Sequence, residues 1–252
     1  MKKLIKLTIS SILIALIIIG LNNPVTKAQS IIFGDLSDGR VSGTGGINTI
    51  SSLRVGDDIG PPAEANLHTL VKFSLSGVSG QVASARLYLY LYNSNVDSSW
   101  DSSSPLTNPG LGDCLVRHID DFGTVDASDY NAPSIGNDPG ILISGTSTPN
   151  IGYLSVDVTA AMQDDINKGR AFSAFLIRSS IESDGDDRAD FWSFRSSDWD
   201  GTSEDPYIEY AFGPIGGILM PVNKLEVLAP YLALAGLIAA ISTVIVIKKR
   251  KD

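Results

Sequence analysis

The chain has 252 residues, 43% of them hydrophobic and 19% charged, and its 28 acidic against 19 basic residues give a net charge of −9. The acidic excess lies in residues 29–217. Only Glu226 and Asp252 of the 28 acidic residues fall outside this region, whereas nine of the 19 basic residues do. The net charge of residues 29–217 is therefore near −16. Such a charge argues against nucleic acid or anionic lipid as a partner. Cys114 is the only cysteine, so an internal disulfide is excluded.

The N-terminal residues have the pattern of an export signal. Three lysines precede an apolar run at residues 9–19, and small residues follow at positions 26 and 28. This order of charge, apolar run and small residues is typical of a secretory signal peptide. We predict a cleaved signal peptide over residues 1–28, and a signal anchor that is retained is the alternative.

Alternating apolar and polar residues predict a series of short strands. The segments with this pattern are residues 67–75, 83–92, 113–119, 152–158, 172–180, 190–197 and 206–212. In the second of them Leu87, Leu89 and Leu91 share one face, and three tyrosines share the other. Stretches rich in Gly, Ser, Asn, Asp and Pro separate the strands.

One short helix is predicted between the fourth and fifth of these strands. Asp157 or Thr159 can cap its N-terminus, Ala161 and Met162 lie on one apolar face, and Gly169 can end it. Many short strands with one helix predict an all-β fold, either a β-sandwich or a jelly roll, for residues 29–212 taken as a single domain.

The C-terminal residues predict a membrane anchor. After a short linker at residues 213–226, residues 227–247 are 21 residues without a charge. As a helix this stretch would be about 31 Å long, enough for a hydrocarbon layer of roughly 30 Å. The basic tail at residues 248–252 is expected to stay in the cytoplasm under the positive-inside rule. We therefore expect a single-pass protein of the cell membrane whose large domain is extracellular.

The chain lacks the motifs of common catalytic and cofactor sites. Its two histidines, His68 and His118, lie in separate strand-like segments, and there is no H-x-x-x-H or C-x-x-C pair for zinc. There is no G-x-S-x-G elbow, no P-loop, and no G-x-G-x-x-G after a strand. We expect a protein that is not an enzyme and has no nucleotide cofactor.

An ordered set of segments carries a family resemblance: "SSLRVGDD", "LVKFSLSGV", "ASARLYLYLY", "DVTAAMQDDINKG", "FSAFLIRSS" and "PYIEYAF". From about Ile31 to Phe212 the chain resembles the DNRLRE domain, also described as carbohydrate-binding module family 96. The resemblance implies a β-sandwich module of secreted and surface proteins, often found beside polysaccharide-degrading domains, with some members binding acidic polysaccharides. The six-letter string that names the family is absent, and no catalytic domain accompanies the module in this sequence. The segment "PVNKLEVLAPYLALAGL" is similar to tails of archaeal surface proteins, which supports the anchor.

Aromatic side chains indicate where a sugar would bind. Sugar sites need planar rings for stacking and polar groups for the hydroxyls. Two tryptophans lie in predicted loops, and Tyr92 extends a stripe of tyrosines on one strand face. The candidate carbohydrate-binding residues are Trp100, Trp199, Tyr88, Tyr90 and Arg195. For the tyrosines the alternative is packing between strands, and an acidic polysaccharide would require a local cluster of arginines.

Residues 183–201 contain six aspartates. Four of them are dense enough to supply hard oxygen ligands, and we take them as candidate ligands of a structural Ca²⁺ ion: Asp184, Asp186, Asp187 and Asp190. The stretch does not match the EF-hand loop, because position 188 is Arg, and a solvated turn is the alternative. Strand-like segments flank residues 181–189, which predicts that these residues form the tip of a hairpin.

These features predict a membrane-anchored, non-catalytic module of the cell surface that binds polysaccharide or another surface glycan. A structural envelope or surface-layer protein that acts by self-association is the alternative. A polysaccharide hydrolase or lyase is less well supported, because no acid/base pair is evident. The identity of the glycan and the oligomeric state stay open.

Overall fold

The computed structural model describes residues 29–48, 52–59, 65–199, 201 and 203–213. The predicted signal peptide, membrane anchor and basic tail lie outside the described residues, as does the linker from residue 214 onward. Among the described residues there is no helix both long enough and apolar enough to cross a membrane.

Strands are the main regular structure of the described residues. They are β1 (Gln29–Phe33), β2 (Gly39–Ser42), β3 (Ile47–Asn48), β4 (Ser52–Asp58), β5 (Ala65–Ser74), β6 (Val82–Val96), β7 (Ser99–Asp101), β8 (Cys114–Ile119), β9 (Gly140–Ile143), β10 (Gly152–Asp157), β11 (Phe172–Ser179), β12 (Asp190–Arg195) and β13 (Tyr207–Phe212). A short 3-10 helix, η1 (Ala127–Asn131), lies between β8 and β9, and the α-helix α2 (Thr159–Lys168) lies between β10 and β11.

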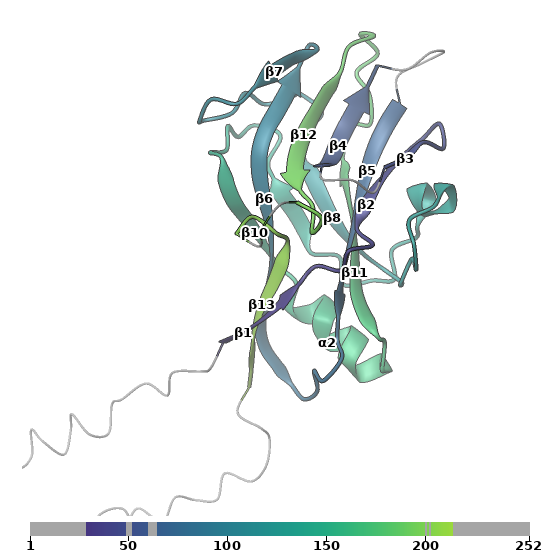
Figure 1. The fold of residues 1–252 in the computed structure, drawn as a ribbon, viewed down its shortest axis with the longest axis vertical. Helices are drawn as coiled ribbons and strands as arrows, with labels where there is room; N and C mark the ends of the chain where they lie inside the picture. Colours follow the sequence, from purple (N-terminus) through teal and green to yellow (C-terminus); the bar gives the residue numbers. More distant parts are fainter. Residues whose placement is uncertain (1–28, 49–51, 60–64, 200, 202, 214–252) are drawn as a thin grey trace, which may run out of the picture. The chain divides into compact units, whose positions relative to one another are not determined.

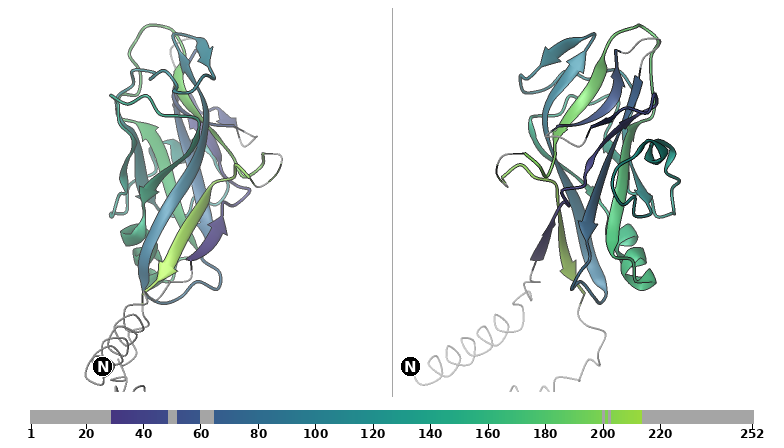
Figure 2. Two further views of the ribbon diagram at one scale, coloured as in Figure 1. Left: turned by 90° about the vertical axis from the view of Figure 1, so that its left-hand side faces the viewer. Right: turned by 45° about the vertical axis from the view of Figure 1, so that its right-hand side comes forward.

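The described strands belong to one antiparallel sheet whose main path runs β1-β13-β6-β12-β4-β5-β11-β8-β9. The long strand β6 is its centre: β13 and β12 pair with successive parts of one edge, and β10 and β7 pair with the other edge. At the far end of the path β9 contacts β10, so the sheet curls back on itself (Figure 1, Figure 2). The all-β prediction is confirmed as a curled antiparallel sheet with one α-helix, and the finer assignment to a sandwich or jelly roll stays a prediction.

The main core is built from the inward faces of these strands. Leu87, Leu89 and Leu91 of β6 are fully buried and pack in one cluster with Phe175 and Phe194. Burying one such side chain contributes about 1.5–3 kcal/mol. Because successive side chains of a strand point to opposite faces, the tyrosines between these leucines lie on the outer face of β6.

The α-helix α2 lies where the sequence predicts a helix. It ends at Gly169, whose φ of 67° is the left-handed conformation typical of a helix C-cap. Its N-cap is Val158, and neither Asp157 nor Thr159 fills that position. The Thr159 hydroxyl instead accepts a hydrogen bond from the backbone N–H of Ala85 in β6. Asp157 Oδ1 accepts a hydrogen bond from the backbone N–H of Thr159. Thr159 therefore joins the helix to the sheet.

The prediction of a hairpin tip at residues 181–189 is wrong. β11 pairs with β5 and β8, whereas β12 pairs with β4 and β6. Two strands, β5 and β4, therefore separate β11 from β12 in the sheet, and the connection passes across them. The local pattern of two strands and a polar turn does not reveal which strands pair.

Candidate functional site

An aromatic surface covers the outer side of β6. Its three tyrosines are half-buried, and two of the strands paired with β6, β10 and β13, each add one more. Tyr153 of β10 lies opposite Tyr90, and Tyr207 of β13 lies opposite Tyr88. We define the aromatic face as these five tyrosines with the Arg and Trp that adjoin them: Tyr88, Tyr90, Tyr92, Tyr153, Tyr207, Arg195 and Trp199.

The tyrosine rings contact one another across three strands. The rings of Tyr88 and Tyr207 are stacked, with centroids 4.6 Å apart and planes at 11°. Tyr153 stands edge-on to Tyr90 at 5.2 Å and to Tyr207 at 5.1 Å. Packing between strands therefore occurs at this stripe, and it holds the half-exposed rings in place.

Arg195, at the end of β12, lies between two aromatic rings. Its guanidinium carbon is 3.9 Å from the ring centroid of Tyr92 and 3.6 Å from that of Trp199. Its Nε donates a hydrogen bond of 2.7 Å to Glu204. The Trp199 residue is 36% exposed, so part of this stack is open to solvent.

The loop that carries Trp199 is fixed from two sides. The hydroxyl of Tyr153 donates to the carbonyl of Asp205 over 3.0 Å. The carboxylate of Asp38 accepts two hydrogen bonds from Ser197, one from its backbone N–H over 2.8 Å and one from its hydroxyl over 3.0 Å. Asp38 is fully buried, and burial raises the pKa of its carboxyl to about 7. The position of Trp199 thus depends on contacts made by its own loop as well as on Arg195.

A second group of aromatic and basic side chains lies at the other end of β12. The guanidinium carbon of Arg54 is 4.5 Å from the ring centroid of Phe191 and 5.2 Å from that of Trp100. The two rings meet edge-on at 5.4 Å. Trp100 is 57% exposed and belongs to the short strand β7, not to a loop. In the described structure its ring contact is with Phe191, which separates it from the aromatic face.

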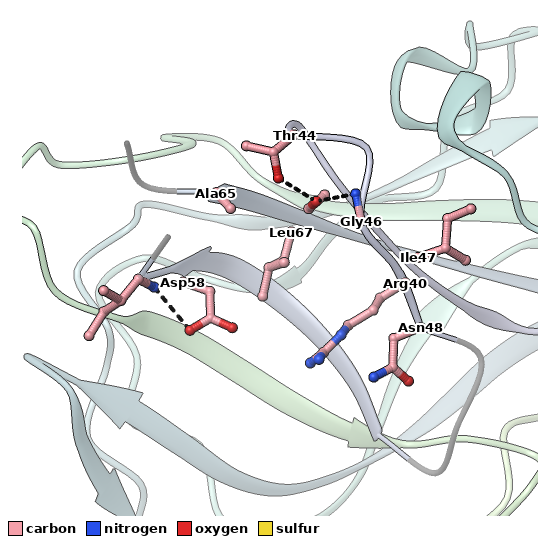
Figure 3. Close-up of a pocket in the computed structure, with 10 residues that line it drawn as sticks. Arg40, Thr44, Gly46, Ile47, Asn48, Asp58, Ala65 and Leu67 are labelled. Atoms are coloured by element: carbon pink, nitrogen blue, oxygen red, sulfur yellow. Dashed lines mark hydrogen bonds between the residues drawn. The ribbon is translucent and has the colours of Figure 1, made fainter. Parts of the chain in front are cut away.

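Arg40 of β2 lies close to residues of both groups, Arg54 and Tyr92. Burial and the charge of Arg54 lower its pKa, while Asp58 and Tyr92 act in the opposite direction. Arg40 lines a pocket of about 290 Å³ together with Asn48 and Asp58 (Figure 3). Among the described residues, Arg40 Nη1 and Arg54 Nε are buried nitrogens without a hydrogen-bond partner. N–H groups of this kind suit an anionic ligand group.

Two groups of described residues can hold a metal ion. One contains His118, Asp164 and Asp165, and the other contains Asp97, Asp186 and Asp190. In each group the three ligand atoms lie within 4.8 Å of one another. The structure therefore contains groups of acidic residues that could bind a metal ion, as the sequence predicts.

Arg170 already balances the charge of the first group. Its Nη1 is 2.8 Å from Asp165 Oδ1 and 2.9 Å from Asp164 Oδ2. His118 Nε2 lies 2.9 Å from Asp165 Oδ1, and the Ser173 hydroxyl donates to Asp165 Oδ2 over 2.6 Å. The serine bonds to the carboxylate and not to the imidazole, so the arrangement is not a nucleophile–base pair. It fastens α2 to β8 and β11.

The second group differs in part from the predicted ligand set. Asp186 and Asp190 belong to it, whereas Asp184 and Asp187 do not. Asp97, from the turn between β6 and β7, takes part instead. No local signal in the sequence points to Asp97, because strand pairing alone brings that turn to the start of β12.

Four of the five predicted sugar-binding residues lie together in the aromatic face: Tyr88, Tyr90, Arg195 and Trp199. The prediction lacks Tyr153 and Tyr207, although each lies in a predicted strand. Alternation within each strand could have placed them on an outer face, but only the register shows that they meet the tyrosines of β6.

No protein-family model matches this chain, and no curated protein matches it. The resemblance to the DNRLRE domain therefore stays a prediction. Function is inferred from the aromatic face, the arginines beside it and the acidic group at Asp190.

Proposed function

We propose that the described domain is a non-catalytic module that binds a polysaccharide or another surface glycan through the aromatic face. One observation carries the proposal: Arg195 is stacked between Tyr92 and the partly exposed Trp199, beside four further tyrosines. Sugar rings stack on aromatic faces, and guanidinium and phenol groups supply hydrogen bonds for sugar hydroxyls. Rings already held by their neighbours lose little conformational entropy on binding.

The arginines favour a glycan that bears carboxylate or sulfate groups. The region that includes the domain carries a net charge near −16, so its overall field does not attract a polyanion. Arg40 and Arg54 lie close together, and although Arg54 pairs with Asp58, each arginine has a buried nitrogen without a partner among the described residues. Arginine binds carboxylate and sulfate-like groups through paired N–H donors.

The proposal extends to the fold type, the cation and the location. A curled antiparallel sheet with one helix is compatible with a β-sandwich of the DNRLRE type. The acidic group at Asp190 supports a structural Ca²⁺ ion. The sequences of residues 1–28 and 227–247 support a membrane-anchored protein of the cell surface. The arrangement of Ser173, His118 and Asp165 supports a role without catalysis.

Glycan binding by the full-length chain in the presence of Ca²⁺ tests the function. We would compare neutral, uronate-containing and sulfated polysaccharides, and then titrate the best ligand into two variants. Trp199→Ala is expected to lower affinity about tenfold or more, as loss of a central aromatic contact does. Trp100→Ala removes the exposed tryptophan that contacts Arg54, and it measures how much this second group adds to binding.

Two results would contradict this function. Binding to none of the polysaccharides would remove the basis for a glycan-binding module. Wild-type affinity in Trp199→Ala would show that the aromatic face is not the binding surface.

Strand β1 favours self-association as a second candidate function. It lies at one end of the described sheet path, and Ile31 and Phe33 are 53% and 50% exposed. An edge strand with exposed apolar side chains can pair with another chain. Sedimentation that shows an oligomer, and its dissociation by Ile31→Lys, would support this function, whereas a strict monomer at high concentration would contradict it.

A further inference from the structure

The turn between β6 and β7 is fastened to the first residues of β12. The Asp97 N–H donates to Asp190 Oδ1 over 2.8 Å, and the Ser98 N–H donates to the Ala189 carbonyl over 3.0 Å. The Ala189 N–H donates in turn to the Ser98 hydroxyl over 3.0 Å. From β4, Asp57 Oδ1 accepts the Asp190 N–H over 2.8 Å. These bonds hold Asp97 and Asp190 side by side.

A third carboxylate comes from the loop before β12. One oxygen each from Asp97, Asp186 and Asp190 lies within 4.8 Å of the other two. Three carboxylates at this spacing repel one another unless a proton or a cation lies between them.

Asp190 supplies a second and independent sign of a ligand. The residue is 2% exposed, and its Oδ2 is buried without a hydrogen-bond partner among the described residues. Its Oδ1 is occupied by the Asp97 N–H, which leaves Oδ2 as the oxygen free to bind an ion. Buried carboxylate oxygens normally have donors, because an unpaired one loses its hydration without compensation.

Arg188 reaches only the outer part of this group. Its Nη1 is 3.2 Å from Asp97 Oδ1, its Nε is 4.0 Å from Asp186 Oδ2, and its side chain is 56% exposed. Among the described residues no ion pair involves Asp190. The His118 group differs, because Arg170 there contacts both carboxylates directly. The buried carboxylate of Asp190 therefore has no cationic partner among the described residues.

We propose that Asp97, Asp186 and Asp190 bind one Ca²⁺ ion, which clamps the β6–β7 turn to the loop before β12. An all-oxygen ligand set that includes loop residues suits Ca²⁺, which accepts 6–8 oxygens at about 2.3–2.6 Å in variable geometry and can complete its shell with water. Zinc sites use Cys and His ligands, and this group has neither. The proposal rests on the Ca²⁺ part of the proposed function, whose ligands it names, and it is independent of glycan binding.

Titration calorimetry of the full-length chain with CaCl₂, up to about 10 mM, tests the site over the affinity range of extracellular Ca²⁺ modules. We expect one Ca²⁺ per chain, weaker binding of Mg²⁺, and a rise in the melting temperature of roughly 5 to 10 °C at a hundredfold excess over Kd. The absence of binding heat and of a melting shift in the wild type would overturn the Ca²⁺ proposal as a whole. Equally tight binding of Mg²⁺ would overturn the choice of Ca²⁺.

Two variants test the ligand set. Asp97→Asn removes one charge at a position with φ of 50°, a backbone conformation that Asn adopts readily, so this variant is expected to fold. Asp97→Asn and Asp190→Asn should each weaken Ca²⁺ binding about tenfold or more. Asp198→Asn, an exposed aspartate beyond the other end of β12, is the matched control and should bind as the wild type does. Wild-type affinity in both ligand variants would overturn this ligand set, whatever the outcome of the glycan measurements.

Discussion

The guanidinium carbon of Arg195 lies 3.6 Å from the ring centroid of Trp199. This contact joins the end of the core strand β12 to an exposed loop, and Tyr92 on the other side of the guanidinium completes the stack. A contact of this kind contributes about 0.5–1 kcal/mol when exposed and about 2 kcal/mol when desolvated. Arg195 therefore orients a ring that is available to a ligand.

Replacing Arg195 with lysine should release the Trp199 ring. Lysine keeps the charge but has neither a planar group to stack on two rings nor an Nε donor for Glu204. We expect stronger quenching of tryptophan fluorescence by acrylamide and an affinity for the glycan that is about tenfold lower, a loss of about 1.4 kcal/mol. Arg117→Lys is the control, because Arg117 is a half-buried arginine of β8, outside the aromatic face. Unchanged quenching in Arg195→Lys would show that the loop holds Trp199 without the arginine.

Asp38 should make the protein less stable as the pH rises. Burial, and to a lesser degree the charges of Asp198 and Asp205, raise its pKa from 3.8 to about 7. A raised carboxyl pKa means that the folded state binds the proton more tightly than the unfolded state does. The stabilisation is therefore fully present below pH 3.8 and is lost as the pH rises to about 7.

Urea unfolding of the wild type and of Asp38→Asn checks this pH dependence. Between about pH 5 and 8, the free energy of unfolding should fall by roughly 3 kcal/mol more in the wild type than in the variant. The amide of Asn can still accept the hydrogen bonds from Ser197. His118 also favours the folded state at low pH, because burial lowers its pKa but its hydrogen bonds and the charge of Asp165 together raise it by more. This contribution is the same in the wild type and the variant, so the comparison removes it. Parallel curves would mean that Asp38 does not titrate in this range.

Asp165→Ala should be strongly destabilising. Its carboxylate is fully buried, and it accepts hydrogen bonds from the Arg170 side chain and the Ser173 hydroxyl beside His118. Removing one partner of a buried ion pair costs about 3–5 kcal/mol, because the remaining charge stays uncompensated. Asp164→Ala, which breaks a more exposed pair with Arg170, should cost about 1 kcal/mol or less. Similar urea midpoints for the two variants would contradict a structural role for Asp165.

Phe194→Ala should also destabilise the fold, by about 3–5 kcal/mol. Phe194 is fully buried in the main core, opposite Leu91 in the sheet register. Phe33→Ala removes the same side chain from the edge strand β1, where the residue is 50% exposed, and should cost far less. Denaturant unfolding of both variants measures the difference, and an equal loss would mean that β1 packs more tightly than its exposure indicates.

Local patterns predicted seven of the described strands and the two faces of β6, but they missed β4, which has seven residues, and also β1, β2 and β9. Alternation of period two is visible within a single segment, so Leu87 and Tyr88 could be assigned to opposite faces before any partner strand was known. The shortest strands were not predicted, since β3 has two residues and β7 has three, which is too few for a pattern. For β12 the pattern predicted the strand but not its partners, because pairing depends on contacts far apart in the sequence.

The candidate site likewise combines residues that the local sequence indicates with contacts that it does not. Trp199 and Arg195 were recognisable as candidates from their residue types, and Asp190 from the density of aspartates around it. That Arg195 stacks on Tyr92, and that Asp97 joins Asp190, follows from pairing of β6 with β12. Neither contact can be predicted from the residues that neighbour it in the sequence.

The sequence by itself determined the acidic charge, the single thiol, the candidate signal and anchor, and the alternation that separates Leu89 from Tyr90. These are properties of composition or of a few neighbouring residues. The tertiary structure decided that Tyr153 and Tyr207 flank the tyrosines of β6, that Trp100 lies apart from Trp199, and that Asp97 replaces Asp184 beside Asp190. The physical reason is that a side chain's direction is set by its own strand, whereas its neighbours are set by strand register, which only the pairing of distant segments defines.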